Sequence, residues 1–274
     1  MIETLKEIVV NTRAARPLVH AITNNVTVND CANIILAAYG APTMAQDERE
    51  VEEITALSDA LVLNLGALRA QEAMRLAGKK ANALGHPVVL DPVAAGASFL
   101  RGETSRRLLH EVKMAVIRGN ASEIRALAMG SETTQGVEVN AVDKVTEENL
   151  EAAVQMVRAF SKRTGAVVAL TGAIDLVSDG ERTAIVRGGC EMMSRITGAG
   201  CMLTALTAAY CGANPDKPFA SAVAAVGVMD VCGELAYRRV CEATEGTASF
   251  RTRLIDAVSL LADEDLDMLH IQMV

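Results

Sequence analysis

The spacing of apolar residues constrains the fold of this chain more than any other feature. Short, uninterrupted apolar runs predict strands buried on both faces, at Leu18–Ile22, Ala60–Leu65, Val88–Leu90, Met114–Ile117 and Ala166–Leu170. The segments between them have the period of amphipathic helices, for example Met1–Ala15, Val51–Leu57, Ala70–Leu84 and Glu147–Arg163. Regular alternation of the two predicts an α/β fold, with helices on both faces of a mostly parallel central sheet.

Two segments depart from this alternation. Asp175–Val186 predicts two strands around the turn Asp179-Gly180-Glu181, and hence an antiparallel hairpin near one edge of the sheet. After Gly198 the pattern predicts helices to the end of the chain. No linker, repeat or low-complexity segment interrupts residues 1–274, which we therefore interpret as one domain. Three glycines lie just past predicted helices and are expected to take left-handed C-terminal conformations: Gly40, Gly85 and Gly165.

Charge and composition exclude several classes of protein. The 274 residues include 26 basic and 34 acidic side chains, a net charge of −8, and no basic run longer than a pair, so nucleic acid is not an expected partner. No uninterrupted apolar stretch has the length of a membrane span, and the charged start is not a signal peptide. The six cysteines lack zinc-type spacing and are expected to be free thiols in a reducing cytoplasm.

Polar residues that follow the predicted strands are the candidates for a site, because ligands of parallel sheets bind beyond the carboxyl ends of the strands. Asn24 and Asn25 follow the first strand, and Asn29 or Asp30 is expected to cap the helix that runs to Tyr39. A turn with an N-cap is the simpler interpretation of this cluster. Asp91 follows the third strand, where it suits a metal or a metal-bound water, although Asp-Pro is also an ordinary turn opener.

The next two strands end in residues that suit phosphate. Arg118 would present a fixed cation to phosphate oxygens, and Thr171 would add a hydroxyl next to the permissive backbone of Gly172. Asn120 and Glu123 have the spacing of a variant capping box, which explains both residues without any role in binding.

The segment Thr197-Gly198-Ala199-Gly200-Cys201 opens an apolar helix and gives the best local signal. Glycines at a helix start expose backbone amides at the positive end of the helix dipole, which predicts an anion hole. The segment is neither a dinucleotide fingerprint nor a Walker loop. Cys201 in the first turn is expected to have a lowered pKa, the alternative being a buried thiol that acts as a small apolar group.

Two further residues are of interest. His20 lies within a predicted buried strand just before the asparagine-rich loop, whereas the other histidines lack partners at ligand spacing. Met44 follows Pro42 in a short apolar run and would suit the wall of a pocket for an apolar ring.

Together these segments resemble the hydroxyethylthiazole kinases, members of the ribokinase-like superfamily that act in thiamine salvage. The resemblance spans about residues 2–262. It rests on the segments Pro17–Asn25, Pro42–Ala45, Val62–Gly66, Leu90–Ala97, Ile117–Ile124, Leu170–Gly172 and Ile196–Thr204. The cysteine in the last segment is the most specific feature, because other ribokinase-like kinases usually carry Asp there.

The resemblance implies transfer of phosphate from ATP to the primary hydroxyl of 4-methyl-5-(2-hydroxyethyl)thiazole, with Mg²⁺. It also implies a homotrimer with active sites between subunits, so that Asn25 would contribute to a substrate site. The roles that it implies are catalysis by Cys201 with Gly198, Ala199 and Gly200, substrate binding by Met44, Gly198 and Asn25, ATP binding by Arg118 and Thr171, and service to the metal through water by Asp91 and Glu123.

One residue departs from the family pattern, since Ala173 stands where the family often has Glu. Three other functions remain open at this point. The first is a related kinase for hydroxymethylpyrimidine or another small alcohol, against which Cys201 and Met44 argue. The second is an ATP- or ADP-dependent dehydratase of hydrated nicotinamide cofactors. The third is a thiazole sensor that does not consume ATP.

Overall fold

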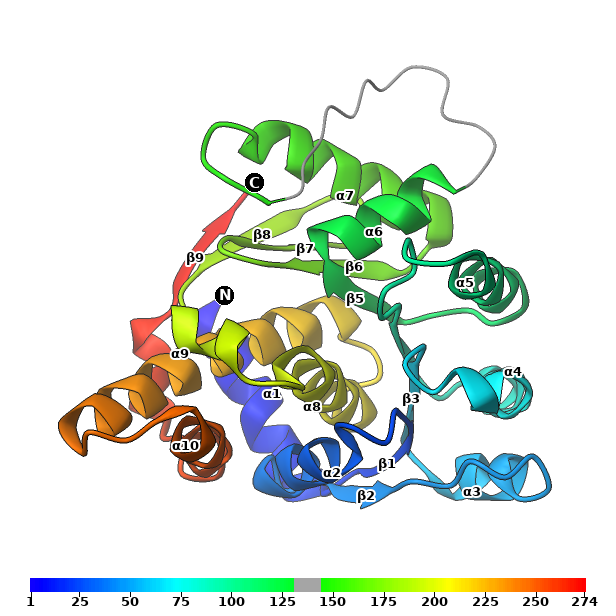
Figure 1. Cartoon of the computed structure of the whole chain (residues 1–274), viewed down its shortest axis with the longest axis horizontal. Helices are drawn as coiled ribbons and strands as arrows, with labels where there is room; N and C mark the ends of the chain where they lie inside the picture. Colours follow the sequence, from blue (N-terminus) through cyan, green and yellow to red (C-terminus); the bar gives the residue numbers. More distant parts are fainter. Residues whose placement is uncertain (131–143) are drawn as a thin grey trace.

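Nine strands form one continuous sheet within residues 1–130 and 144–274, the part of the chain that the computed structural model describes (Figure 1). Their order is β2-β1-β3-β4-β5-β6-β7-β8-β9. Neighbours from β2 to β6 are parallel, and the last three strands are antiparallel to their predecessors. The strands are β1 (Leu18–Ile22), β2 (Ala41–Thr43), β3 (Ala60–Asn64), β4 (Val88–Asp91), β5 (Val116–Asn120), β6 (Val167–Thr171), β7 (Asp175–Ser178), β8 (Thr183–Arg187) and β9 (His270–Met273).

Helices cover both faces of this sheet, as the sequence predicted (Figure 1). One layer contains α1 (Ile2–Ala15), α2 (Val28–Ala37), α8 (Ala199–Ala213), α9 (Pro218–Glu242) and α10 (Thr247–Ser259). The other contains α3 (Val51–Leu57), α4 (Gln71–Leu84), α5 (Phe99–Glu111), α6 (Ala121–Met129) and α7 (Leu150–Thr164). Short 3₁₀ helices are η1 (Leu68–Ala70), η2 (Glu191–Arg195) and η3 (Asp263–Met268).

Successive residues of the buried strands pack into opposite layers. In β3, Ala60 and Val62 belong to the core beneath α8 and α9, whereas Leu61 and Leu63 belong to the core beneath α4. Side chains of a strand alternate between the faces of its sheet, so both faces of β3 need apolar residues. This double burial explains why the strands appear in the sequence as continuous apolar runs.

The prediction that the chain is helical after Gly198 is wrong at its end. Residues His270–Met273 form β9, which pairs with β8 and becomes the edge of the sheet beyond the predicted hairpin of β7 and β8. The backbones of Thr183 and Val274 exchange two hydrogen bonds of 2.9 Å. Strand β9 is mostly exposed, so it has no apolar run that would have revealed it.

Local details around α2 also differ from expectation. The helix begins after Thr27, not at Asn29 or Asp30, because the side-chain Oδ1 of Asn24 accepts the amides of Val26 and Thr27 and turns the chain earlier. At the other end Tyr39, with φ of 68°, takes the left-handed conformation expected of Gly40.

Two of the three glycines expected to end helices have the predicted conformation, and the third does not. Gly85 and Gly165 have the left-handed φ values that were predicted for them. Gly40 serves a different purpose, since a Cβ there would lie 2.9 Å from the Ile35 side chain and 3.1 Å from the Pro17 carbonyl oxygen.

Helix α9 is long and apolar enough to cross a membrane, although it contains no uninterrupted apolar run of that length. However, 83% of its most apolar window is buried inside the protein. The helix packs against β5, β6, β7 and β8, so its composition is that of a core helix.

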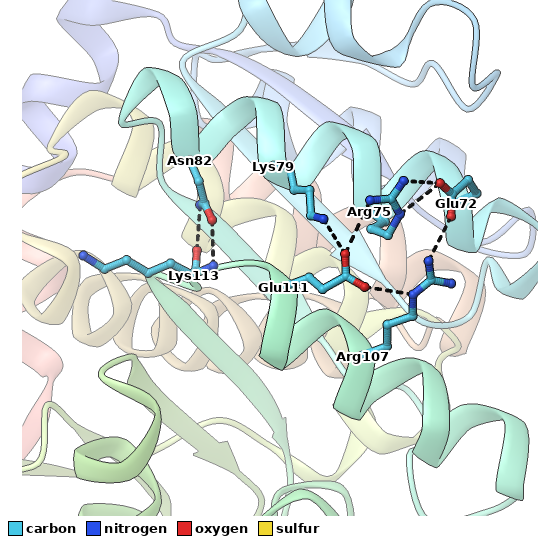
Figure 2. Close-up of polar contacts among 7 residues, drawn as sticks. All are labelled: Glu72, Arg75, Lys79, Asn82, Arg107, Glu111 and Lys113. Carbon is cyan, nitrogen blue, oxygen red and sulfur yellow. Dashed lines mark hydrogen bonds and ion pairs between the residues drawn. The ribbon is translucent and has the colours of Figure 1, made fainter.

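Ion pairs connect the outer surfaces of α4 and α5 (Figure 2). The carboxylate oxygens of Glu111 lie 2.5 Å from Nζ of Lys79, 3.0 Å from Nε of Arg107 and 3.4 Å from Nη1 of Arg75. Asn82 exchanges hydrogen bonds of 2.9 and 2.7 Å with the backbone of Lys113. These contacts fix α5, which begins directly after the loop that follows β4, and each exposed pair adds little to stability on its own.

Candidate active site

A cavity of about 900 Å³ runs along the carboxyl edge of the sheet. Its walls come from the ends of β4, β5 and β6, the start of β7, the segment 188–196, the first turn of α8 and the middle of α9. It therefore opens at the edge where the sequence analysis expected ligands to bind.

At one end of the cavity, Asn64 joins Cys201 to Asp91. Its side-chain Nδ2 lies 3.2 Å from Sγ of Cys201 and 3.0 Å from Oδ2 of Asp91. Thr204, one turn along α8 from Cys201, donates to the same Asp91 oxygen at 2.9 Å. Asn24 donates to Asn64 at 3.3 Å and lies 3.6 Å from the Cys201 sulfur. The buried ends of β3 and β4 thus hold the start of α8 through side-chain hydrogen bonds.

The Cys201 thiol does not have the lowered pKa that its position on the helix predicted. Burial raises the pKa of Cys201, and the negative charge of Asp91 raises it further. Together they outweigh the hydrogen bonds from Thr27 and Asn64 and the positive charge of Arg118. Burial also raises the pKa of Asp91, to about 6. At neutral pH the pair is therefore a neutral thiol beside an ionised carboxylate.

The start of α8 has the form of an anion site. Gly198 is the N-cap, with φ of 87°, and no side chain caps the helix. The first hydrogen bond of the helix runs from the amide of Met202 to the carbonyl oxygen of Gly198. The amides of Ala199, Gly200 and Cys201 have no acceptor among the described residues. Only glycine suits position 198, where φ is positive and a Cβ would lie 2.8 Å from Cγ2 of Thr27.

Arg118 brings a positive charge to these amides. Its guanidinium packs against Gly200, where an added Cβ would collide with it. Nη2 of Arg118 donates to the Thr171 hydroxyl at 2.5 Å, and its buried Nε has no hydrogen-bond partner among residues 1–130 and 144–274. A buried donor without an acceptor is costly, so this nitrogen is suited to an anionic ligand in the cavity.

Glu123 has the structural role that the capping box predicted. Its Oε2 accepts the amide of Asn120 at 2.9 Å, while Asn120 accepts the amide of Glu123. Its Oε1 accepts the amide of Ala94 at 2.9 Å, which holds the loop after β4. Glu123 also lines the cavity and its charge raises the pKa of Asp91, so the two carboxylates are close.

Two predicted substrate residues lie apart from this cavity. Asn25 is exposed in the loop after β1, and Met44 is half-buried after β2, packed against the core. Neither belongs to the residues that line the cavity. His20 is fully buried, with ring nitrogens 2.9 Å from the Thr55 hydroxyl and the Ala45 carbonyl oxygen, and burial lowers its pKa. It is therefore a neutral structural residue.

Several polar residues of the cavity region were not predicted from the sequence. Asn64 appeared only within the predicted strand Ala60–Leu65 and the segment Val62–Gly66, although a polar residue inside an apolar run is itself a signal. Asp230 interrupts the apolar first half of α9, and Asp175 begins β7. Ala173, where a carboxylate was expected from the resemblance, lines the cavity with a methyl group.

Comparisons with known proteins show the family to which the chain belongs. The hydroxyethylthiazole kinase family matches residues 9–264. A hydroxyethylthiazole kinase from Clostridium acetobutylicum is 50% identical over 265 residues, which are 96% of this chain and 97% of that protein.

Solved structures give the same result. The structure of a hydroxyethylthiazole kinase protein from Pyrococcus horikoshii OT3 superposes with a TM-score of 0.87, at 34% identity and 99% coverage of both chains. A pyridoxal kinase from Staphylococcus aureus, with a TM-score of 0.57 and 18% identity over 79% of this chain and 87% of that one, shares the fold.

Proposed function

The chain belongs to the hydroxyethylthiazole kinase family, and from this premise we propose how its cavity transfers phosphate. The protein is a phosphotransferase that acts on an alcohol, with ATP as the co-substrate. The acceptor is the primary hydroxyl of 4-methyl-5-(2-hydroxyethyl)thiazole, and the products are its phosphate ester and ADP. The reaction belongs to thiamine salvage.

The observation that best supports a phosphate site is that the Arg118 guanidinium lies next to the amides at the start of α8. The guanidinium packs against Gly200, and its buried Nε has no partner in the part of the chain that the structure describes. Phosphoryl transfer passes through a loose transition state, so it needs alignment and neutralisation of charge more than strong base catalysis. Amides at a helix start and an arginine provide both where the phosphoryl group carries its charge.

Each residue then has a role in this proposal. The amides of Ala199, Gly200 and Cys201, with Gly198 as the turn that frees them, bind the transferring phosphoryl group. Arg118 and Thr171 bind the other phosphates. The neutral thiol of Cys201 orients the acceptor hydroxyl, and Asp91, ionised above its pKa of about 6, is the member of the pair able to accept the proton.

The residues present also fit Mg²⁺ held through water. No three acidic, histidine or cysteine side chains in the described residues gather into a metal-binding group, which argues against a cage made by the protein alone. Mg²⁺ usually keeps several waters and takes one or two carboxylates together with substrate phosphates. Asp91 and Glu123 are two such carboxylates in the same cavity. Bound there, the ion would neutralise the phosphates of ATP.

In a homotrimer, Asn25 and Met44 would contribute to substrate binding. Asn25 is exposed beside Val26, whose side chain is 75% exposed. Exposed apolar residues next to a polar loop suit a contact with a second copy, in which Asn25 would reach a neighbour's cavity and Met44 would approach the thiazole. The six cysteines are free thiols, which supports a cytoplasmic location.

A coupled assay of ADP release tests the proposed acceptor. ATP and Mg²⁺ are supplied with the thiazole alcohol, with hydroxymethylpyrimidine, with a hydrated nicotinamide cofactor, or with no acceptor. We expect ADP only with the thiazole alcohol. ADP with the pyrimidine would change the acceptor but keep the anion site, and ADP with the hydrated cofactor would favour the dehydratase. A thiazole sensor would bind the alcohol and release no ADP.

A further inference from the structure

Two buried carboxyl groups lie in a part of the cavity that the proposed phosphoryl transfer does not use. Asp175 at the start of β7 and Asp230 in the middle of α9 are each 6% exposed, and both line the cavity. Oδ1 of Asp175 accepts the amide of Gly172 at 2.8 Å. No amide, guanidinium or hydroxyl of the described residues donates to Asp230, whose Oδ2 is buried without a partner.

The two carboxyl groups are close enough to share a proton. Burial raises the pKa of Asp175 to about 6, and burial together with the negative charge of Asp175 raises the pKa of Asp230 well above its ordinary value. The protonated member, Asp230, can donate to Asp175. Such a pair presents both hydrogen-bond acceptors and a hydrogen-bond donor to the cavity, and the two groups together carry only one negative charge.

The position of the pair along the sheet indicates what lies there. Asp91 is on β4, Arg118 on β5, Thr171 on β6 and Asp175 on β7, and neighbouring strands lie about 4.8 Å apart. The inference rests on the proposed function: with the γ-phosphate at the start of α8 and the other phosphates at Arg118, the rest of the nucleotide extends toward β7 and β8. The nucleoside would therefore lie next to the carboxyl pair.

The surroundings of the pair leave room for a sugar. The backbone of Gly188 and Gly189 passes so close to Asp230 that a Cβ at Gly188 would lie 2.9 Å from the Asp230 Cβ. Met193 and Met229 give the same region an apolar wall. A hydroxyl both donates and accepts hydrogen bonds, which matches a proton-sharing pair, whereas a phosphate would be repelled by the ionised carboxylate.

We propose that Asp175 and Asp230 form the subsite that binds the ribose hydroxyls of the nucleotide. The subsite selects ribonucleotides over nucleotides that lack these hydroxyls. It takes no part in the transfer itself.

Titration calorimetry with nucleotide and Mg²⁺, in the absence of the thiazole alcohol, tests this subsite. Wild-type protein is expected to bind 2′,3′-dideoxy-ATP about tenfold more weakly than ATP, the effect of losing one hydrogen bond to a charged group. Asp175→Asn, which removes the ionised carboxylate of the pair, should weaken ATP binding by about tenfold and change dideoxy-ATP binding by less than twofold. Asp230→Asn provides a second test if the first variant does not fold. Asp216→Asn removes the same charge from an exposed turn and should bind both nucleotides as the wild type does.

Equal weakening of ATP and dideoxy-ATP by both substitutions would overturn the ribose assignment. A loss that appears with ATP but not with inosine triphosphate would also overturn it, because the pair would then recognise the base. Absence of any ATP binding to the wild type is a different result, since it would contradict the proposed kinase function itself.

Discussion

Nδ2 of Asn64 lies 3.2 Å from Sγ of Cys201, although 137 residues separate them in the chain. The same nitrogen lies 3.0 Å from Oδ2 of Asp91. Asn64 is buried at the end of β3, and its Oδ1 accepts the amide of Gly66 at 2.8 Å, which fixes the orientation of the side chain. One amide thus sets the distance between the proposed orienting thiol and the proposed metal carboxylate.

Removal of this amide should impair turnover more than nucleotide binding. We expect Asn64→Ala to lower kcat by at least tenfold, the effect of about 1.4 kcal/mol, and to change the KM for ATP by less than threefold. The sulfur also loses a donor, so alkylation of Cys201 by iodoacetamide should become slower. Peptide mass spectrometry would follow the alkylation.

Asn82→Ala is a matched control, because Asn82 bridges α4 to the backbone of Lys113 on the outer surface (Figure 2). This variant should keep the kcat and the alkylation rate of the wild type. Equal loss of kcat in both variants would show that Asn64 acts only through stability.

Replacement of the thiol tests the role of Cys201. A neutral thiol that orients the acceptor contributes about one hydrogen bond, so Cys201→Ala should bind ATP normally and turn over roughly tenfold more slowly. Steady-state kinetics and calorimetry would measure the two effects. Unchanged turnover would leave the backbone amides as the catalytic groups. A loss above about a thousandfold would instead support a thiolate acting as a general base.

Asp91→Asn should lower the activity of the enzyme and raise its stability. Burial raises the pKa of Asp91 from 3.8 to about 6, so the folded state holds its proton more tightly than the unfolded state does. Stability of the wild type therefore falls as pH rises from about 4 to 6, and the ionised group costs on the order of 3 kcal/mol above that range. In the presence of EDTA at pH 7.5, the free energy of unfolding measured with denaturant should be higher for the variant than for the wild type by up to this amount.

The difference should disappear toward pH 4, where both proteins carry a neutral group. The variant should also need more Mg²⁺ for the activity that remains. A variant less stable than the wild type at pH 7.5 would contradict the buried charge, and overlapping Mg²⁺ titrations would contradict the metal assignment.

Gly200→Ala should separate nucleotide binding from folding. The new Cβ would collide with the guanidinium of Arg118 and displace it from Thr171, so we expect ATP to bind at least tenfold more weakly. Alanine favours a helix by about 0.5–1 kcal/mol over glycine, so thermal stability should not fall in proportion. In Gly102→Ala the Cβ comes no closer than 3.6 Å to the Ala95 carbonyl oxygen, and ATP binding should not change. Equal ATP affinity of the two variants would place the nucleotide elsewhere.

The sequence predicted those parts of the molecule whose cause is local. Double burial produces the apolar runs of β1, β3, β4 and β6, and the residues of the first turn make the free amides of α8 and the capping box of Asn120 visible in the sequence. Strand β9 depends instead on its pairing with β8, and it carries no such pattern of its own.

The chemistry of the site depends on contacts between distant segments. The pKa of Cys201 is raised by burial and by Asp91, which lies at the end of β4, whereas the prediction relied only on the position of Cys201 in the first turn of α8. Asp175 and Asp230 likewise meet only because α9 packs across β7. No spacing in the sequence reveals either pair.

Phosphorus-31 NMR of one reaction tests the central claim most directly. With ATP, Mg²⁺ and 4-methyl-5-(2-hydroxyethyl)thiazole, the account predicts a phosphate monoester on the hydroxyethyl group, formed in equal amount with ADP. Release of inorganic phosphate with ADP, and no ester, would contradict phosphoryl transfer to this alcohol.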